Sequence, residues 1–230
     1  MQADRNDTVL QAERLGKQVS SPEGTLAILS DVTLTISRGE TVAVMGASGA
    51  GKSTLLALLA GLDAPTSGTV HLAGNELTAL DEDGRAAVRA RHVGFVFQSF
   101  HLVPSLTALE NVMLPLELAG RADARAAALE VLGRVGLAAR VGHYPKQLSG
   151  GEQQRVAIAR GFVTRPDVLF ADEPTGNLDT HTGERIIDLL FELNRATGTT
   201  LVLVTHERGL ATRCARVITL DAGRIVADRA

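Results

Sequence analysis

The stretch Gly46-Ala47-Ser48-Gly49-Ala50-Gly51-Lys52-Ser53 decides the fold of this 230-residue chain. It matches the phosphate-loop pattern G-x-x-x-x-G-K-[ST] at every fixed position. Residues 41–45, just before it, form a β-branched apolar run typical of a buried strand. Residues 52–60, just after it, predict a helix that Gly61 ends. A strand, a glycine-rich loop and a helix in this order favour a nucleotide site over an ordinary glycine-rich turn.

The residue types in this loop suit phosphate binding. Glycines let backbone N–H groups point at phosphate oxygens, and the start of the following helix adds a partial positive charge. We expect Lys52 to reach the β- and γ-phosphates of a bound nucleotide, Ser53 to offer its hydroxyl to Mg²⁺, and Thr54 to complete the nucleotide site. The loop alone does not separate a kinase, a GTPase, a transporter subunit and a repair ATPase.

Two carboxylates follow a second predicted buried strand, residues 168–171. Asp172 and Glu173 should therefore lie at the sheet edge where ligands bind in open α/β sheets. Asp172 suits Mg²⁺, which prefers a few carboxylates together with water and phosphate oxygens. Glu173 is the predicted catalytic base that polarises the attacking water. Without the phosphate loop, a solvated acidic turn would explain this pair equally well.

A further helix is predicted to begin at Leu148-Ser149-Gly150-Gly151-Glu152. Ser149 and Glu152 have the S-x-x-E spacing of a capping box. The two glycines expose the N–H groups of the first turn, which predicts a second helix start able to bind an anion. An ordinary capped helix remains the alternative, because capping boxes are common.

The rest of the chain alternates strands and helices around a helical insert. Apolar runs and polar–apolar alternation predict strands at residues 8–13, 26–36, 69–73, 93–97, 200–205, 217–220 and 224–227. An amphipathic helix is expected at residues 182–196, whereas Ala, Leu, Glu and Arg dominate residues 99–160. We predict one α/β domain over residues 1–230, with a core at about 1–98 and 161–230 and a helical subdomain at about 99–160.

Composition argues against several classes of protein. The net charge of −3 is a poor match to a dedicated nucleic-acid binder, so no nucleic-acid partner is expected. No apolar run approaches the roughly 18 residues of a membrane helix, and the N-terminus lacks the apolar region of a signal peptide. Cys214 is the single cysteine, so we expect a cytoplasmic protein in which it packs as a small side chain.

Together these motifs resemble the family of ABC-type ATPase subunits over about residues 26–226. The family's motifs occur in order: the phosphate loop, Gln98, the signature segment at residues 148–152, Asp172-Glu173, Asn177-Leu178-Asp179 and His206. Residues 94–98, 106–112 and 171–179 are similar to the branch of the LolD, MacB and FtsE ATPases. The resemblance implies a P-loop NTPase (RecA-like) core with a small antiparallel β region and an α-helical insert.

The resemblance also implies how the site works. A head-to-tail homodimer would enclose two Mg-ATP, with the phosphate loop of one subunit facing Ser149, Gly150, Gly151 and Glu152 of the other. Gln98 would link Mg²⁺ and the attacking water to the helical insert. His206 would lie near the γ-phosphate, and Asp179 would lie at the dimer interface.

The implied partner is an inner-membrane permease of FtsX/MacB type, docking near residues 99–116, from Ser99 to Leu116. The chain would then sit on the cytoplasmic face of that membrane and energise export, lipid-linked cargo extraction or mechanotransmission. The alternative is a soluble ABC-type ATPase without a permease, acting in DNA repair or assembly. The stretch between Lys52 and Ser149 is too short for the long coiled coil of repair members. A P-loop kinase would not explain the signature segment or His206.

One position departs from the family pattern. Relatives place an aromatic residue against adenine upstream of the Gly39-Glu40 turn, but Val19 stands there and no aromatic residue precedes Phe95. We expect aliphatic contact to replace stacking and base selectivity to be weak. The basic cluster of Arg85, Arg89, Arg91 and His92 is interpreted as a solvated helix face in preference to a permease or lipid contact.

Overall fold

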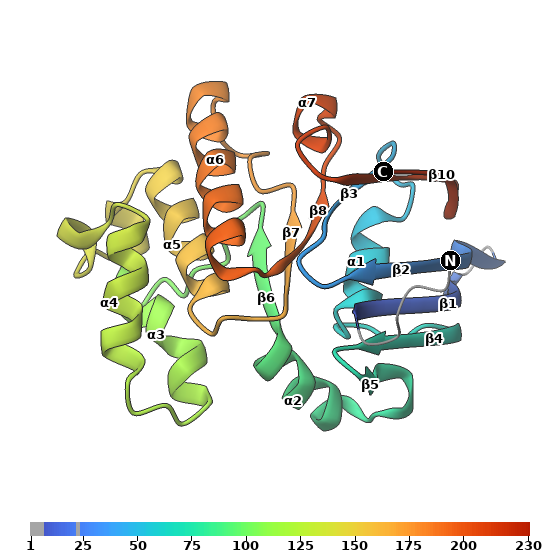
Figure 1. The fold of residues 1–230 in the computed structure, drawn as a ribbon, viewed down its shortest axis with the longest axis horizontal. Helices are drawn as coiled ribbons and strands as arrows, with labels where there is room; N and C mark the ends of the chain where they lie inside the picture. Colours follow the sequence, from blue (N-terminus) through green and yellow to red (C-terminus); the bar gives the residue numbers. More distant parts are fainter. Residues whose placement is uncertain (1–6, 22–23) are drawn as a thin grey trace.

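The computed structural model describes residues 7–21 and 24–230, which form two sheets flanked by helices (Figure 1). The four-stranded sheet has the order β2-β1-β4-β5, with bounds Thr8–Ser21 (β1), Gly24–Ser37 (β2), Ser67–Leu72 (β4) and Asn75–Glu76 (β5). Its strands pair antiparallel. This sheet is the predicted antiparallel β region.

The six-stranded sheet has the order β10-β9-β3-β8-β7-β6. Its strands are Thr41–Met45 (β3), Val93–Phe97 (β6), Val168–Asp172 (β7), Thr200–Val204 (β8), Arg216–Asp221 (β9) and Arg224–Arg229 (β10). Strands β6, β7, β8, β3 and β9 run parallel, and β10 returns antiparallel to β9. Every residue of β8 is buried, as expected for a parallel strand covered on both faces.

Helices cover this sheet and form a separate helical layer beyond β6 (Figure 1). Their bounds are Lys52–Leu59 (α1), Glu82–His92 (α2), Ala108–Leu118 (α3), Ala124–Arg134 (α4), Gly150–Phe162 (α5), Thr180–Thr197 (α6) and Arg208–Ala211 (α7). Three short 3₁₀ turns lie at Leu77–Ala79, Ala138–Arg140 and Pro145–Gln147. Helices α3, α4 and α5 occupy the stretch predicted as helical insert. In the part of the chain that the structure describes, no helix is both long and apolar enough to cross a membrane.

The structure extends several predicted elements. The strands expected at 8–13 and 26–36 are parts of β1 and β2, which continue as a long hairpin because they pair with each other as far as Ser21 and Gly24. Helix α6 begins at Thr180, earlier than expected, since the Asp179 side chain accepts from the N–H of Thr182 and caps it. Helix α2 contains the basic cluster interpreted as a helix face, and the Asp81 side chain caps its start by accepting from the N–H of Gly84.

The interpretation of the basic cluster as a solvated face is wrong for two of its members. The side chains of Arg85 and Arg89 are only 18% and 19% exposed, and each guanidinium pairs with Glu82 at 2.7 Å. Arg89 also donates to the carbonyl of Gly61 at the end of α1. Arg89 therefore connects α2 to the end of α1, whereas the ion pairs with Glu82 lie within α2.

Candidate active site

The phosphate loop joins the buried strand β3 to α1, as its sequence predicted. Gly46 and Gly51 have φ of 158° and 97°, which residues with a side chain rarely adopt. A Cβ on Gly46 would lie 2.4 Å from the carbonyl oxygen of Leu220, and one on Gly51 would lie 2.8 Å from Leu29. Close packing as well as backbone conformation thus requires glycine at both positions.

A cavity of about 700 Å³ opens over this loop. It is lined by Ile28, Gly46, Ala47, Ser48, Gly49, Gly51, Lys52, Ser53, Thr54, Glu173 and His206. Most of the predicted loop residues therefore face one space together with the predicted base and histidine. Ala50 is instead buried beneath the loop, where its carbonyl accepts a hydrogen bond from the N–H of Gly223.

Lys52 is folded back on its own loop. Its ammonium group is largely buried and donates to the carbonyl oxygens of Gly46 at 2.9 Å and Ala47 at 3.0 Å. A buried charge needs such partners. Phosphate oxygens entering the cavity would offer the same ammonium group stronger, charged acceptors.

The carboxylates lie at the carboxyl end of β7, beside the loop. Burial is the main cause that raises the pKa of Asp172, and the charge of Glu173 adds to it; a hydrogen bond from Ser53 and the charge of Lys52 oppose it. The Ser53 hydroxyl and the Asp172 carboxylate are thus in contact. Two oxygen ligands from the chain, with phosphate and water oxygens beside them, fit the preferences of Mg²⁺.

Glu173 is held in a strained backbone conformation at the edge of the cavity. Its φ is 45°, its N–H donates to the carbonyl of Val204, and its own carbonyl accepts from Gly176. The side-chain Oε1 lies 3.1 Å from Nδ1 of His206. Strained residues of this kind cluster at functional sites. The structure therefore brings together the two side chains predicted to act at the γ-phosphate.

Gln98 lies apart from this cavity, directly after β6. Its side-chain amide donates to Oδ1 of Asn177 at 3.3 Å, and its carbonyl accepts from Asn177 at 3.0 Å. The predicted role at Mg²⁺ would require this side chain to turn. Asn177 was identified from the sequence only as part of the motif at residues 177–179, and its hydrogen bonds with Gln98 were not predicted.

The predicted capping box at the signature segment is present. Ser149 Oγ accepts from the N–H of Glu152, and a Glu152 carboxylate oxygen accepts from the N–H of Ser149 at 2.8 Å. This backbone hydrogen bond is the main cause that lowers the pKa of Glu152. A Cβ on Gly151 would lie 2.6 Å from Thr182, so the starts of α5 and α6 touch. Gly150 and its neighbours lie outside the lining of the phosphate cavity.

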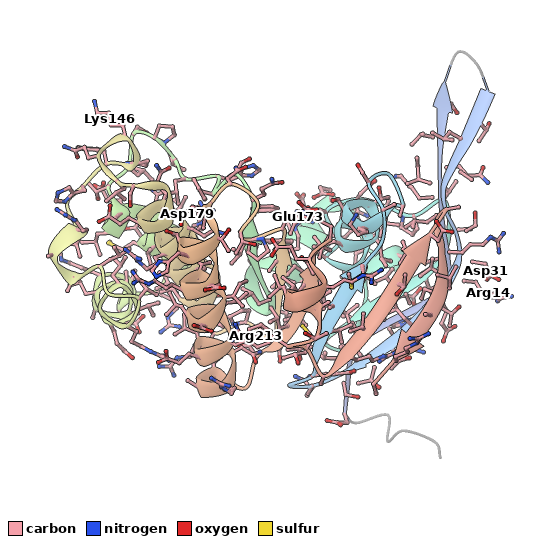
Figure 2. The ribbon with its side chains drawn as sticks, turned by 90° about the horizontal axis from the view of Figure 1, so that it is seen from above. Arg14, Asp31, Lys146, Glu173, Asp179 and Arg213 are labelled. Carbon is pink, nitrogen blue, oxygen red and sulfur yellow. The ribbon has the colours of Figure 1, made fainter. Side chains whose placement is uncertain are left out.

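Asp179 caps α6 and lies between Glu173 and the helical layer that carries Lys146 (Figure 2). A missed residue is Gln154 on α5, which is fully buried and donates to the carbonyl of Pro174 at 2.6 Å. It thus holds the turn that follows Glu173. The sequence signal for Gln154 was its position as a polar residue on the same face of α5 as the buried Gly151 and Ile158.

Comparison with known proteins agrees with this geometry. A family model described as ABC transporter matches residues 29–176. The ABC transporter ATP-binding protein YbbA of Escherichia coli (strain K12) is 56% identical over 221 residues, which cover 95% of this chain and 97% of YbbA. The lipoprotein-releasing system ATP-binding protein LolD of Xanthomonas campestris pv. campestris (strain 8004) is 51% identical over 226 residues, covering 97% of this chain and 95% of LolD.

A solved structure gives the same result for the fold. The dimeric bacterial ABC transporter cassette MJ0796 has a TM-score of 0.89 and 42% identity, covering 96% of this chain and 97% of that one. A post-hydrolysis dimer of MJ0796 bound to ADP and Pi has the same values. The predicted fold, the resemblance to the branch that includes LolD, and ATP hydrolysis as the activity are confirmed. This chain belongs to the ABC transporter family, among the ATP-binding proteins of the YbbA and LolD type.

Proposed function

We propose that this chain hydrolyses Mg-ATP as a homodimer and that each cycle drives an inner-membrane permease of FtsX/MacB type. One observation carries the proposal: the phosphate loop, Glu173 and His206 line one cavity, whereas the signature segment lies outside it. A single chain therefore provides the phosphate cradle and the base, and a second copy would bring the other anion-binding helix start.

Within one chain, the steps follow from the contacts around the cavity. The loop N–H groups and Lys52 bind the phosphates, and Lys52 exchanges its carbonyl partners for phosphate oxygens. Mg²⁺, held by Ser53 and Asp172, would supply positive charge at the β- and γ-phosphate oxygens. Glu173 accepts a proton from the attacking water, and His206 orients the Glu173 carboxylate through their 3.1 Å contact.

The proposed dimer gives a function to the start of α5, where Ser149 is exposed and Gly150 is half-buried. In the dimer, the N–H groups at the capped start of α5, beginning with that of the half-buried Gly150, would face the γ-phosphate bound by the partner's loop. Asp179 would lie at the same interface. The similarity to MJ0796, described as dimeric and as bound to ADP and Pi, supports this arrangement. Hydrolysis would remove the bridging phosphate and loosen the dimer.

The permease assignment is supported by the similarity to LolD, which is named as part of a lipoprotein-releasing system. We place its docking on residues 99–116, which follow Gln98 and include α3. The protein would then act on the cytoplasmic face of the inner membrane. Export, extraction of lipid-linked cargo and mechanotransmission remain the candidate uses of the energy.

We also propose an aliphatic contact for the nucleotide base. Val19 pairs with Leu26 across the β1–β2 hairpin, and the two residues are 41% and 57% exposed. Ile28, two residues on from Leu26 and at a shift in the register of the hairpin, lines the phosphate cavity. Val19, Leu26 and Ile28 thus form an apolar strip on the hairpin, which projects from the rest of the molecule (Figure 2). Such a strip offers no hydrogen bond that would distinguish adenine from guanine.

Two measurements test the proposal. With Mg-ATP the Glu173→Gln variant should run as a dimer in size-exclusion chromatography, and with ADP it should run as a monomer. Tagged protein purified from detergent-solubilised membranes should carry an integral-membrane permease. A monomer under both conditions would refute the dimer. Recovery of the chain without any membrane protein would favour the soluble alternative.

A further inference from the structure

The loop after Gln98 contains two consecutive residues with left-handed backbone. Phe100 has φ of 60° and His101 has φ of 48°. Residues with a side chain adopt this conformation at a cost in free energy, so the surroundings must hold it. These two residues follow Ser99 at the start of the docking segment, residues 99–116. What holds them there bears directly on how that segment connects to the site.

Arg160 on α5 supplies the contacts. One guanidinium nitrogen donates to the carbonyl of His101 at 2.6 Å, and the other donates to the carbonyl of Phe100 at 2.9 Å. The planar guanidinium fork is suited to bridging two neighbouring acceptors. Arg160 is half-buried, and this burial lowers the pKa of its guanidinium group. Its hydrogen bonds are made to the two strained residues.

The helix is fixed against the strand that leads to Gln98. A Cβ on Gly94 of β6 would lie 2.2 Å from the carbonyl oxygen of Gly161, and one on Gly161 would lie 3.1 Å from the carbonyl of Phe95. The two backbones are therefore in direct contact beside Arg160. This contact sets the distance over which the guanidinium reaches the loop.

The same loop touches the start of the signature helix. The ring of Phe100 lies 3.8 Å from the position of a Cβ on Gly150, and the ring of His101 stacks on Phe97 with centroids 4.7 Å apart. Gln98, which precedes this loop, is hydrogen-bonded to Asn177. The loop thus lies between the signature segment and the turn that follows Glu173.

We propose that Arg160 is a positioning residue for ATP hydrolysis, which holds Phe100 and His101 and thereby fixes Gln98 and the docking segment relative to the signature helix. The proposal rests on the proposed function of Gln98 and of the docking segment. Movement of the docking segment would reach the start of α5 through Phe100, and it would reach Gln98 through the two peptide units between them.

The test compares steady-state kinetics of the full chain with Arg160→Lys, which keeps the charge but loses the fork. We expect kcat to fall by about tenfold, because misplacing a reacting group by about 1 Å costs up to about a hundredfold. KM for Mg-ATP should stay within about twofold, since the phosphate loop is untouched. Arg195→Lys, at an exposed position in the last turn of α6, is the matched control and should behave as wild type.

Rescue separates positioning from general packing. Glycine adopts the left-handed conformation without strain, so adding His101→Gly to Arg160→Lys should restore at least about half of the lost kcat. A wild-type kcat in Arg160→Lys, or a loss that His101→Gly leaves unchanged, would overturn the proposal. If Arg160→Lys is not recovered folded, Phe100→Ala must show the same fall in kcat at constant KM, and an unchanged kcat would overturn the proposal. Failure of the proposed ATPase site itself would appear differently, as loss of Mg-ATP hydrolysis in the wild-type chain.

Discussion

Replacing Glu173 with glutamine removes the proposed base and one negative charge while keeping the shape of the side chain. The φ of 45° at this residue and its backbone bonds to Val204 and Gly176 are unaffected by the change. A glutamine oxygen can still accept a hydrogen bond from His206. Because the charge of Glu173 helps to raise the pKa of Asp172, the variant should also favour a charged Asp172. ATP binding should therefore be equal or tighter.

The expected fall in kcat and the expected change in Tm distinguish a loss of catalysis from a loss of stability. A general base contributes about 10²–10⁴-fold, so kcat should fall by that factor, or by about 3–5 kcal/mol in the barrier. The contact with His206 involves a side chain that is 62% exposed and is worth about 0–1 kcal/mol of stability. A chain of this size would then lose at most about 2–4 °C in Tm.

Phosphate release at saturating Mg-ATP, nucleotide binding by fluorescence and a thermal melt measure these three quantities. Glu192→Gln removes a carboxylate from an exposed position on α6 and should keep wild-type turnover. Turnover of Glu173→Gln within about threefold of wild type would refute the assignment of the base. A large fall in Tm would show instead that this side chain holds the fold.

Three further predictions concern other parts of the chain. ATP and GTP should bind with similar affinity, and Val19→Tyr should tighten purine binding by about 1 kcal/mol or more, roughly fivefold, in a competition assay; a strong ATP preference in wild type would show that adenine is read another way. Burial raises the pKa of the Cys214 thiol to about 12, so native protein should resist iodoacetamide at pH 8 and react on unfolding; rapid labelling of the native state would contradict this. Hydrogen bonds from His92 and Arg38 hold the pKa of Asp167 below its ordinary 3.8 despite the opposing effect of burial. Because that pKa is lowered in the folded state, the stabilisation is present above pH 3.8 and is lost as the pH falls through the folded value. Asp167→Asn should therefore lower the free energy of unfolding by about 1 kcal/mol at neutral pH and flatten its decline in acid, as urea titrations at several pH values would show; parallel acid curves would exclude this contribution.

The phosphate site was predictable because its determinants are local. A buried strand, a loop with glycine at 46 and 51 and a following helix fix the backbone within a few residues. Asp172 and Glu173 were predictable for a related reason, since parallel strands end at one edge and β7 lies in the same sheet as β3. The capping box of Ser149 and Glu152 is likewise a short-range pattern.

The features that were missed depend on partners distant in the sequence. The role of Gln154 depends on its hydrogen bond to Pro174, and the role of Arg160 depends on its hydrogen bonds to two carbonyls in the loop after β6. The sequence suggested a solvated face for Arg85 and Arg89 because it does not show that they donate to the carbonyls of Leu80 and Gly61. The length of the β1–β2 hairpin was missed since its outer part pairs mainly with itself and buries few side chains.

The contacts of Lys52 explain why dimerisation in this proposal should depend on nucleotide. In the free chain, the ammonium group of Lys52 donates to the carbonyls of Gly46 and Ala47, which balance its charge. The phosphate loop therefore offers no strong attraction to the start of a second α5. Bound phosphates reverse the sign of the charge at the cavity mouth, and the N–H groups of Gly150 and Gly151 on a second copy then become favourable partners. In the free chain, Ser149 and Glu152 already satisfy part of the hydrogen bonding at this helix start through their capping box. Dimers should therefore form when the γ-phosphate is bound and dissociate when it leaves. The loop held by Arg160 should transmit the resulting movement of α5 to the docking segment.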